Sequence, residues 1–119
     1  MKNTATGIKR ILMAFVYSYQ GLRAVYKTEA AFRQDLCACA VGLLLCALFA
    51  RNITEYAVMI LSLFLIILME LVNSAIEVII DRISPRYHPL SGRAKDIGSL
   101  LVCLAFANAL IIYGLIILF

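Results

Sequence analysis

Three long apolar stretches follow one another along the chain, at about residues 30–50, 56–80 and 97–119. An α-helix needs about 20 apolar residues to cross the hydrocarbon core of a bilayer, and each stretch reaches that length. The middle stretch includes 14 uncharged residues in a row, Tyr56–Met69. The pattern therefore predicts an all-α integral membrane protein with three transmembrane helices, organised as one membrane domain over residues 1–119.

Two polar segments connect these stretches. The first has the sequence RNITE, residues 51–55, in which Asn52 or Thr54 can cap the helix that follows. The second is RISPRYHPLSGRAKD, residues 82–96, whose two prolines break the chain. We expect both segments to be connections outside the helices.

Residues 1–29 precede the first apolar stretch and show a different pattern. In helical projection five polar residues gather in a narrow arc: Lys2, Lys9, Gln20, Arg23 and Lys27. Six apolar residues lie broadly opposite: Ile8, Ile11, Phe15, Tyr19, Leu22 and Tyr26. This arrangement predicts an amphipathic helix that lies on the membrane surface, with a new helix starting near Thr28 and Glu29.

Composition agrees with a membrane protein, because 64% of the residues are hydrophobic and the mean hydropathy is +0.96. The net charge of +4 comes without a run of basic residues, which argues against nucleic-acid binding. The basic residues concentrate in the N-terminal 35 residues, which include Lys2, and in the second connection. The positive-inside rule then places both of these in the cytoplasm and the first connection on the other side.

Four polar residues at the end of the middle stretch share one helix face. Glu70, Asn73, Glu77 and Asp81 form a stripe about four turns long. A charged residue near mid-bilayer opposes insertion by about 2.5–3.5 kcal/mol. The stripe must therefore face protein, a cation or a water-filled site.

The stripe has the chemical groups that a phosphoryl-transfer site requires. Carboxylates bind Mg²⁺ through oxygen, and a carboxylate free of metal can take a proton from a hydroxyl nucleophile. The second connection adds groups that can contact a nucleotide: Arg86, Tyr87, His88, Arg93, Lys95 and Asp96. No GxxxxGK loop is present, so the site would not be a P-loop. Two alternatives remain open from spacing alone, a polar stripe that packs helices in an oligomer and a proton-coupled transporter.

Two motifs identify a resemblance. The segment ELVNSAIEVIIDR, Glu70–Arg82, followed by YHPLSGRAKDIGS, Tyr87–Ser99, resembles the prokaryotic diacylglycerol kinase family. The segment TEAAFRQD, Thr28–Asp35, resembles a second signature of that family. The resemblance covers nearly the whole chain, and EAAFRQ and SGRAKD look more like the Gram-negative diacylglycerol kinases than the Gram-positive undecaprenol kinases.

The resemblance implies a homotrimer in the bacterial inner membrane with active sites shared between subunits. Its N-terminus would be cytoplasmic and its C-terminus periplasmic. The implied reaction transfers the γ-phosphate of MgATP to the free hydroxyl of diacylglycerol and gives phosphatidic acid, for lipid recycling. An undecaprenol kinase of the same fold is the nearest alternative, and a small membrane transporter or a scaffold are further ones.

The resemblance also implies roles for individual residues. Glu70 is the expected general base, Asn73 orients the reacting groups, and Glu29 and Glu77 are expected to hold the Mg²⁺ of MgATP. The expected ATP contacts are Arg10, Tyr17, Glu29, Glu77, Arg86, Tyr87, His88, Lys95 and Asp96. The expected lipid-substrate contacts are Arg10, Ala14, Ser18, Tyr19, Arg23, Tyr26, Ala31, Gln34, Asp35, Glu70 and Ser99.

Overall fold

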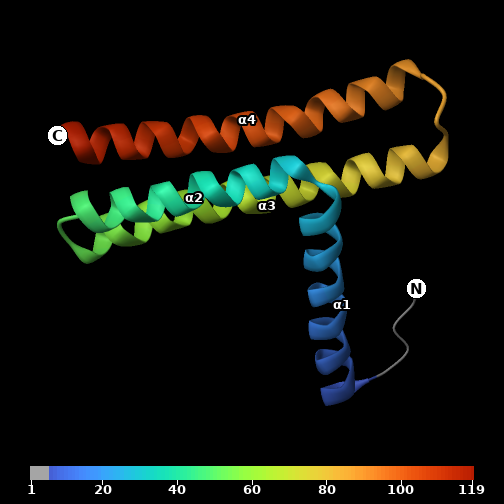
Figure 1. Ribbon diagram of the computed structural model, residues 1–119, viewed down its shortest axis with the longest axis horizontal. Coiled ribbons are helices and arrows are strands. Elements are labelled where there is room, and N and C mark those ends of the chain that lie inside the picture. Colours follow the sequence, from blue (N-terminus) through green and yellow to red (C-terminus); the bar gives the residue numbers. More distant parts are fainter. Residues whose placement is uncertain (1–5) are drawn as a thin grey trace.

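The computed structural model describes residues 6–119 and contains four helices in this part of the chain. They are α1 (Gly7–Thr28), α2 (Ala30–Phe49), α3 (Ile53–Ile83) and α4 (Pro89–Leu118). Helices α2, α3 and α4 run alongside one another, whereas α1 crosses their direction steeply (Figure 1). Each of the three aligned helices is long and apolar enough to cross a membrane. The prediction of an all-α chain with one N-terminal helix and three membrane-spanning helices is therefore confirmed.

The first connection is short, because α2 ends at Phe49 and a side-chain cap at Asn52 starts α3 at Ile53. The Asn52 side-chain oxygen accepts a hydrogen bond from the backbone N–H of Glu55 at 2.9 Å, which satisfies one of the unpaired donors of the first turn. Helix α3 then continues without a break from Ile53 to Ile83. Of the two caps that the sequence offered, Asn52 is the one that the structure uses.

The second connection differs from the prediction. Only residues 84–88 lie outside the helices, and α4 begins at Pro89 rather than near residue 97. Proline fits the first helical position because the N–H that it lacks would be unpaired there. The His88 ring also caps this end, since its Nδ1 accepts the backbone N–H of Leu90 at 3.1 Å. Lys95 and Asp96 therefore lie on a helix.

The core lies where α3 packs between its two neighbours. Buried side chains from all three aligned helices meet there: Cys39, Cys46, Met59, Leu63, Ile66, Ala105, Ala109 and Tyr113. The Tyr113 hydroxyl donates a hydrogen bond of 2.8 Å to the backbone carbonyl of Gly42, which joins α4 to α2 inside this apolar core. A buried polar group needs such a partner, so this bond helps to fix the packing of the helices.

Helix α1 has no buried residue, and all six residues of its predicted apolar face are exposed. Many apolar side chains on the outer surfaces of the other helices are exposed as well, among them Leu61, Leu110 and Leu118. Exposed apolar surface of this extent is typical of contact with lipid or with other chains. Residues 1–5, which include Lys2 of the predicted surface helix, lie outside the described residues.

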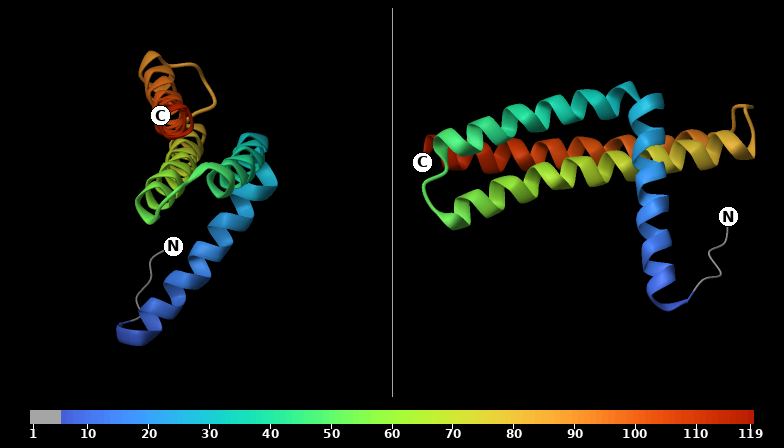
Figure 2. Two further views of the ribbon diagram at one scale, coloured as in Figure 1. Left: turned by 90° about the vertical axis from the view of Figure 1, so that its left-hand side faces the viewer. Right: turned by 60° about the horizontal axis from the view of Figure 1, so that its bottom comes forward.

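The corner between α1 and α2 is held by Arg33. Its Nη1 donates to the backbone carbonyls of Tyr26 and Lys27, in the last turn of α1. A cation at this position complements the negative end of the helix dipole. Figure 2 shows the sharp turn between the two helices at this corner. Glu29 is the single residue between them, so Arg33 helps to fix where Glu29 lies.

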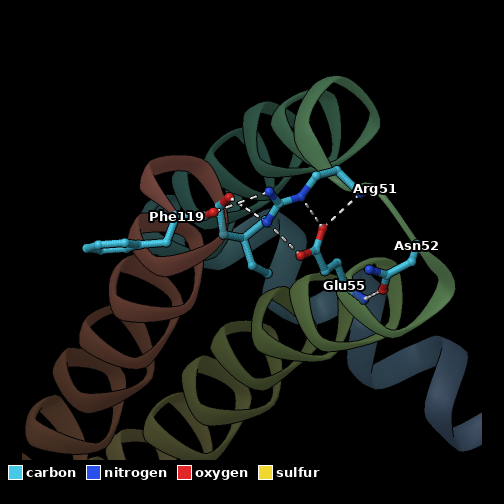
Figure 3. Close-up of polar contacts among 5 residues, drawn as sticks. Arg51, Asn52, Glu55 and Phe119 are labelled. Atoms are coloured by element: carbon cyan, nitrogen blue, oxygen red, sulfur yellow. Dashed lines mark hydrogen bonds and ion pairs between the residues drawn. The ribbon is translucent and has the colours of Figure 1, made fainter.

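Arg51 links the start of α3 to the end of α4 (Figure 3). Its guanidinium pairs with Glu55 at 2.9 Å and also donates to the backbone carbonyls of Ile116 and Phe119 at 3.4 and 3.3 Å. The last carbonyls of a helix have no partner within that helix. Arg51 supplies one from the first connection and holds the end of α4 beside the start of α3.

Candidate functional site

The polar stripe of α3 passes from a buried to an exposed environment. Glu70 is 5% exposed and lies deepest, Asn73 and Glu77 are half-buried, and Asp81 is exposed. The deep end of the stripe faces protein rather than lipid. This agrees with the expectation that charged groups at this depth need a partner or a polar site.

Asp35 lies beside Glu70. It comes from α2, is 8% exposed, and its carboxyl lies close enough to Glu70 to interact with it electrostatically. The Asp35 Oδ2 atom has no hydrogen-bond partner among residues 6–119. Two carboxyls in contact repel each other when both are ionised, and a proton shared between them removes this repulsion.

A cavity of about 420 Å³ opens beside Glu70, and we call it the Glu70 cavity. Four residues expected in the site line it, and they come from three helices: Ala31, Glu70, Asn73 and Ser99. Val102, Cys103 and Phe106 complete the lining. These three follow Ser99 along α4, away from the second connection, so the cavity joins polar groups to an apolar wall that extends deeper into the span.

Asn73 connects the two glutamates of the stripe. It lines the Glu70 cavity, and its Nδ2 donates to Glu77 Oε1 at 3.3 Å. Glu29, at the corner between α1 and α2, lies close enough to Glu77 to interact with it electrostatically. The structure therefore places the two expected metal ligands within electrostatic range of each other, and Asn73 holds one of them by a hydrogen bond.

The two glutamates suit a divalent cation that a nucleotide brings with it. No group of three or more His, Cys, Asp or Glu residues within 6–119 could hold a metal ion alone. Mg²⁺ bound to a nucleotide typically takes one or two carboxylates from the protein, and phosphates and water fill its other positions. Glu29 and Glu77 supply that number of carboxylates. The Asn73 Oδ1 atom is buried and has no hydrogen-bond partner among residues 6–119.

A second cavity of about 280 Å³ lies at the connection between α3 and α4, and we call it the connection cavity. Four expected ATP contacts line it: Arg86, Tyr87, His88 and Lys95. The Lys95 ammonium pairs with Asp81 Oδ1 at 2.9 Å. Because His88 Nδ1 accepts a hydrogen bond, the neutral ring carries its proton on Nε2, which is free to donate. Asp96 is exposed and does not line this cavity.

The expected contacts on α1 are not brought to either cavity within one chain. Helix α1 runs away from the other three helices, so most of its length lies apart from them (Figures 1 and 2). This holds for Arg10, Ala14, Tyr17, Ser18, Tyr19, Arg23 and Tyr26, none of which lines the Glu70 or connection cavity. Gln34, on α2, is exposed and lines neither of them. Their roles stay predictions.

The sequence interpretation missed two features of the site. The apolar wall of the Glu70 cavity could have been found from spacing, because Val102, Cys103 and Phe106 follow Ser99 at helical intervals of three, four and seven residues. Arg33 had a weaker signal, a basic residue just after the boundary between two helices. Its two carbonyl partners depend on the angle of the corner, which local sequence does not determine.

Comparison with known proteins finds relatives along most of the sequence. Residues 16–118 match the family described as "Prokaryotic diacylglycerol kinase". The chain is 42% identical over 111 residues to a diacylglycerol kinase of Escherichia coli (strain K12), covering 93% of this chain and 91% of that protein. It is 38% identical over 114 residues to the diacylglycerol kinase of Haemophilus influenzae, covering 96% and 97%. The diacylglycerol kinase of Pseudomonas aeruginosa is 46% identical over 94 residues, covering 79% and 76%.

Proposed function

The chain belongs to the prokaryotic diacylglycerol kinase family, and from that premise we propose that the Glu70 cavity is where it phosphorylates diacylglycerol. The protein is a membrane-embedded lipid kinase that uses a nucleotide as phosphate donor. The observation that carries the proposal is a buried carboxylate, Glu70, that lines a cavity with both polar groups and an apolar wall. Such a cavity fits a lipid whose hydroxyl is polar and whose acyl chains are not.

Glu70 acts as the general base. It removes the proton from the free hydroxyl of diacylglycerol, and the hydroxyl oxygen forms a bond to the γ-phosphorus of ATP. The bond between that phosphorus and the β,γ-bridging oxygen breaks, so that ADP leaves and phosphatidic acid forms. Once it has gained this proton, Glu70 is neutral and can donate a hydrogen bond to the adjacent Asp35 carboxyl, whose Oδ2 has no partner among residues 6–119.

Glu29 and Glu77 hold the Mg²⁺ of MgATP, and Asn73 keeps the Glu77 carboxylate in position. When bound, the ion neutralises charge on the β- and γ-phosphate oxygens. Glu77 lies two helical turns from Glu70 towards the second connection. This separation leaves room for the γ-phosphate between the base and the metal ligands.

The nucleotide extends from Glu77 towards the connection cavity. Lys95 offsets phosphate charge, and Asp96 contributes from the next position of α4. Arg86, Tyr87 and His88 contact the ribose or base, with the His88 Nε2 proton available to an acceptor. Lys95 gives up part of its ion pair with Asp81 when phosphate binds, and this exchange is easy because both side chains are exposed.

The protein works as a homotrimer in the bacterial inner membrane. The N-terminus and the connection between α3 and α4 are cytoplasmic, and the C-terminus is periplasmic. One observation supports shared sites: α1 carries many expected ATP and lipid contacts but runs away from the other three helices of its own chain (Figure 1). In a trimer the α1 helix of one subunit can reach the cavity of a neighbour, where Arg10, Tyr17 and the other α1 contacts would act.

The direct test is phosphate transfer from labelled ATP in mixed micelles. Dioleoylglycerol and undecaprenol are compared as acceptors, with Mg²⁺ present and with the cation removed by a chelator. Transfer to dioleoylglycerol that depends on the cation and is lost in Glu70→Gln is the expected result. A preference for undecaprenol would keep the chemistry but assign a different lipid. Absence of transfer to either acceptor would refute the kinase proposal.

A further inference from the structure

Gly98 is a buried residue on α4 that faces the polar stripe of α3. The Cβ atom of any larger residue here would overlap Asn73 Oδ1, and it would lie only 3.3 Å from Asn73 Cγ. Real Cβ atoms essentially never overlap a neighbouring atom as this one would overlap Oδ1, so the Asn73 side chain would have to move. The bare Cα of Gly98 is therefore what leaves space for the Asn73 amide.

The Asn73 amide has little freedom to move without losing its contact to Glu77. Its Nδ2 donates to Glu77 Oε1 at 3.3 Å, while its Oδ1 is the atom that faces Gly98. Oδ1 is buried and has no donor among residues 6–119, so no hydrogen bond holds the amide from that side. Close packing against Gly98 does this instead. A methyl group on residue 98 would push the amide away and lengthen or break its bond to Glu77.

We propose that Gly98 is a positioning residue for the nucleotide's divalent cation, acting through Asn73 on the carboxylate of Glu77. This inference rests on the proposed role of Glu77 as a metal ligand. Groups that orient a metal ligand typically change metal affinity or activity by about 10- to 100-fold when they are altered. Gly98→Ala is expected to have an effect in that range, although residue 98 itself touches neither the lipid nor the nucleotide.

Other glycines show what a purely structural role looks like. A Cβ at Gly42 would meet only the flexible Leu63 side chain, so that position concerns packing in the apolar core. A Cβ at Gly114, on the same helix as Gly98, would meet nothing within 4 Å. Gly114→Ala adds the same methyl group to the same helix and is therefore the matched control.

The experiment measures cation binding separately from turnover. The full-length protein in micelles is titrated with Mn²⁺ and a non-hydrolysable ATP analogue, and free Mn²⁺ is followed by electron paramagnetic resonance. The Mg²⁺ dependence of turnover is measured alongside. Gly98→Ala should weaken Mn²⁺ binding by about 10-fold or more, whereas Gly114→Ala should stay within about twofold of the wild type.

A double variant tests whether Gly98 acts through Asn73. If it does, Asn73→Ala combined with Gly98→Ala should bind Mn²⁺ no more weakly than Asn73→Ala alone, because the amide that the methyl group displaces is already gone. Additive losses would overturn the proposal, as would unchanged binding in Gly98→Ala. If Gly98→Ala fails to fold, the double variant has the space to fold and should then match Asn73→Ala; its failure to do so would also overturn the proposal.

Glu77→Gln separates this inference from the proposed function. If Glu77→Gln weakens Mn²⁺ binding but Gly98→Ala does not, the role of Gly98 is wrong and the metal ligand stands. If Glu77→Gln binds Mn²⁺ normally, the metal-ligand assignment is wrong, and the inference about Gly98 is overturned with it.

Discussion

Replacing Glu70 by glutamine should remove catalysis without harming the fold. The two side chains have nearly the same shape, so the substitution leaves no cavity in a position that is only 5% exposed. Glutamine cannot accept a proton as the carboxylate does. Glu70→Gln therefore changes the proton chemistry of the site and little else.

The loss of turnover follows from the size of general base catalysis. A positioned base contributes about 10²- to 10⁴-fold to the rate. Each factor of ten corresponds to about 1.4 kcal/mol, so the transition state should lose about 3–5 kcal/mol of stabilisation. Affinity for MgATP should stay near that of the wild type, because the cation and phosphates lie towards Glu77 in the proposed site.

The thermal stability of Glu70→Gln should not fall with its turnover and can even rise. In the wild type Asp35 Oδ2 is a buried acceptor with no donor among residues 6–119, and the Glu70 carboxyl lies near it. The amide of glutamine can donate to that oxygen and removes one of two adjacent acidic groups. An unsatisfied buried polar group costs about 1–3 kcal/mol, so Glu70→Gln should unfold at the same temperature as the wild type or at a higher one.

The assay combines initial rates at saturating dioleoylglycerol and MgATP with nucleotide binding and thermal unfolding in the same micelles. Glu55→Gln is the matched control: it is the same substitution on the same helix, at the end where Glu55 pairs with Arg51. It should lower thermal stability and leave turnover per folded molecule unchanged. Near-wild-type turnover in Glu70→Gln would refute the assignment of the base. Equal losses of turnover and MgATP affinity would show instead that Glu70 binds the nucleotide.

Three further substitutions test other parts of the site and fold. Glu77→Gln should raise the Mg²⁺ concentration needed for half-maximal turnover, and an unchanged Mg²⁺ dependence would exclude it as a ligand. Asp81→Asn frees Lys95 from an exposed ion pair, so stability should change by less than about 1 kcal/mol while KM for ATP falls; a rise in KM would mean that Asp81 itself helps to bind the nucleotide. Tyr113→Phe removes the buried hydrogen bond to the Gly42 carbonyl and should lower the free energy of unfolding by about 1 kcal/mol at unchanged turnover, whereas an equal loss of turnover would link the core to catalysis.

The sequence predicted the spans well because the bilayer imposes a simple rule on them. An apolar run of about 20 residues has few other possibilities, and the polar cap at Asn52 marks the start of α3 clearly. The predicted start of α4 was wrong because proline can affect a helix in two opposite ways. A proline in the interior of a helix breaks it, whereas a proline in the first turn favours it. Pro89 starts α4 because the His88 ring caps this first turn.

The contacts across helices could not be predicted, because they depend on how two helices are rotated against each other. The period of α3 placed Glu70, Asn73 and Glu77 on one face, but it could not show that Asp35 from α2 lies against Glu70. Nor could it show that Gly98 faces Asn73, since a glycine in an apolar helix is typical of many packing contacts.

The burial gradient along α3 explains why one helix can serve two substrates that come from different phases. A rise of 1.5 Å per residue puts Glu77 about 10 Å and Asp81 about 16 Å from Glu70 along the helix axis. In the proposed site, the lipid hydroxyl and the γ-phosphate would occupy most of the first distance, since reacting atoms approach each other to about 3–3.5 Å. The remainder of the nucleotide then falls beside Asp81 and Lys95, where both side chains are exposed. In the proposed mechanism, the lipid hydroxyl therefore meets the base at the buried end of the stripe, and the water-soluble nucleotide enters from its exposed end.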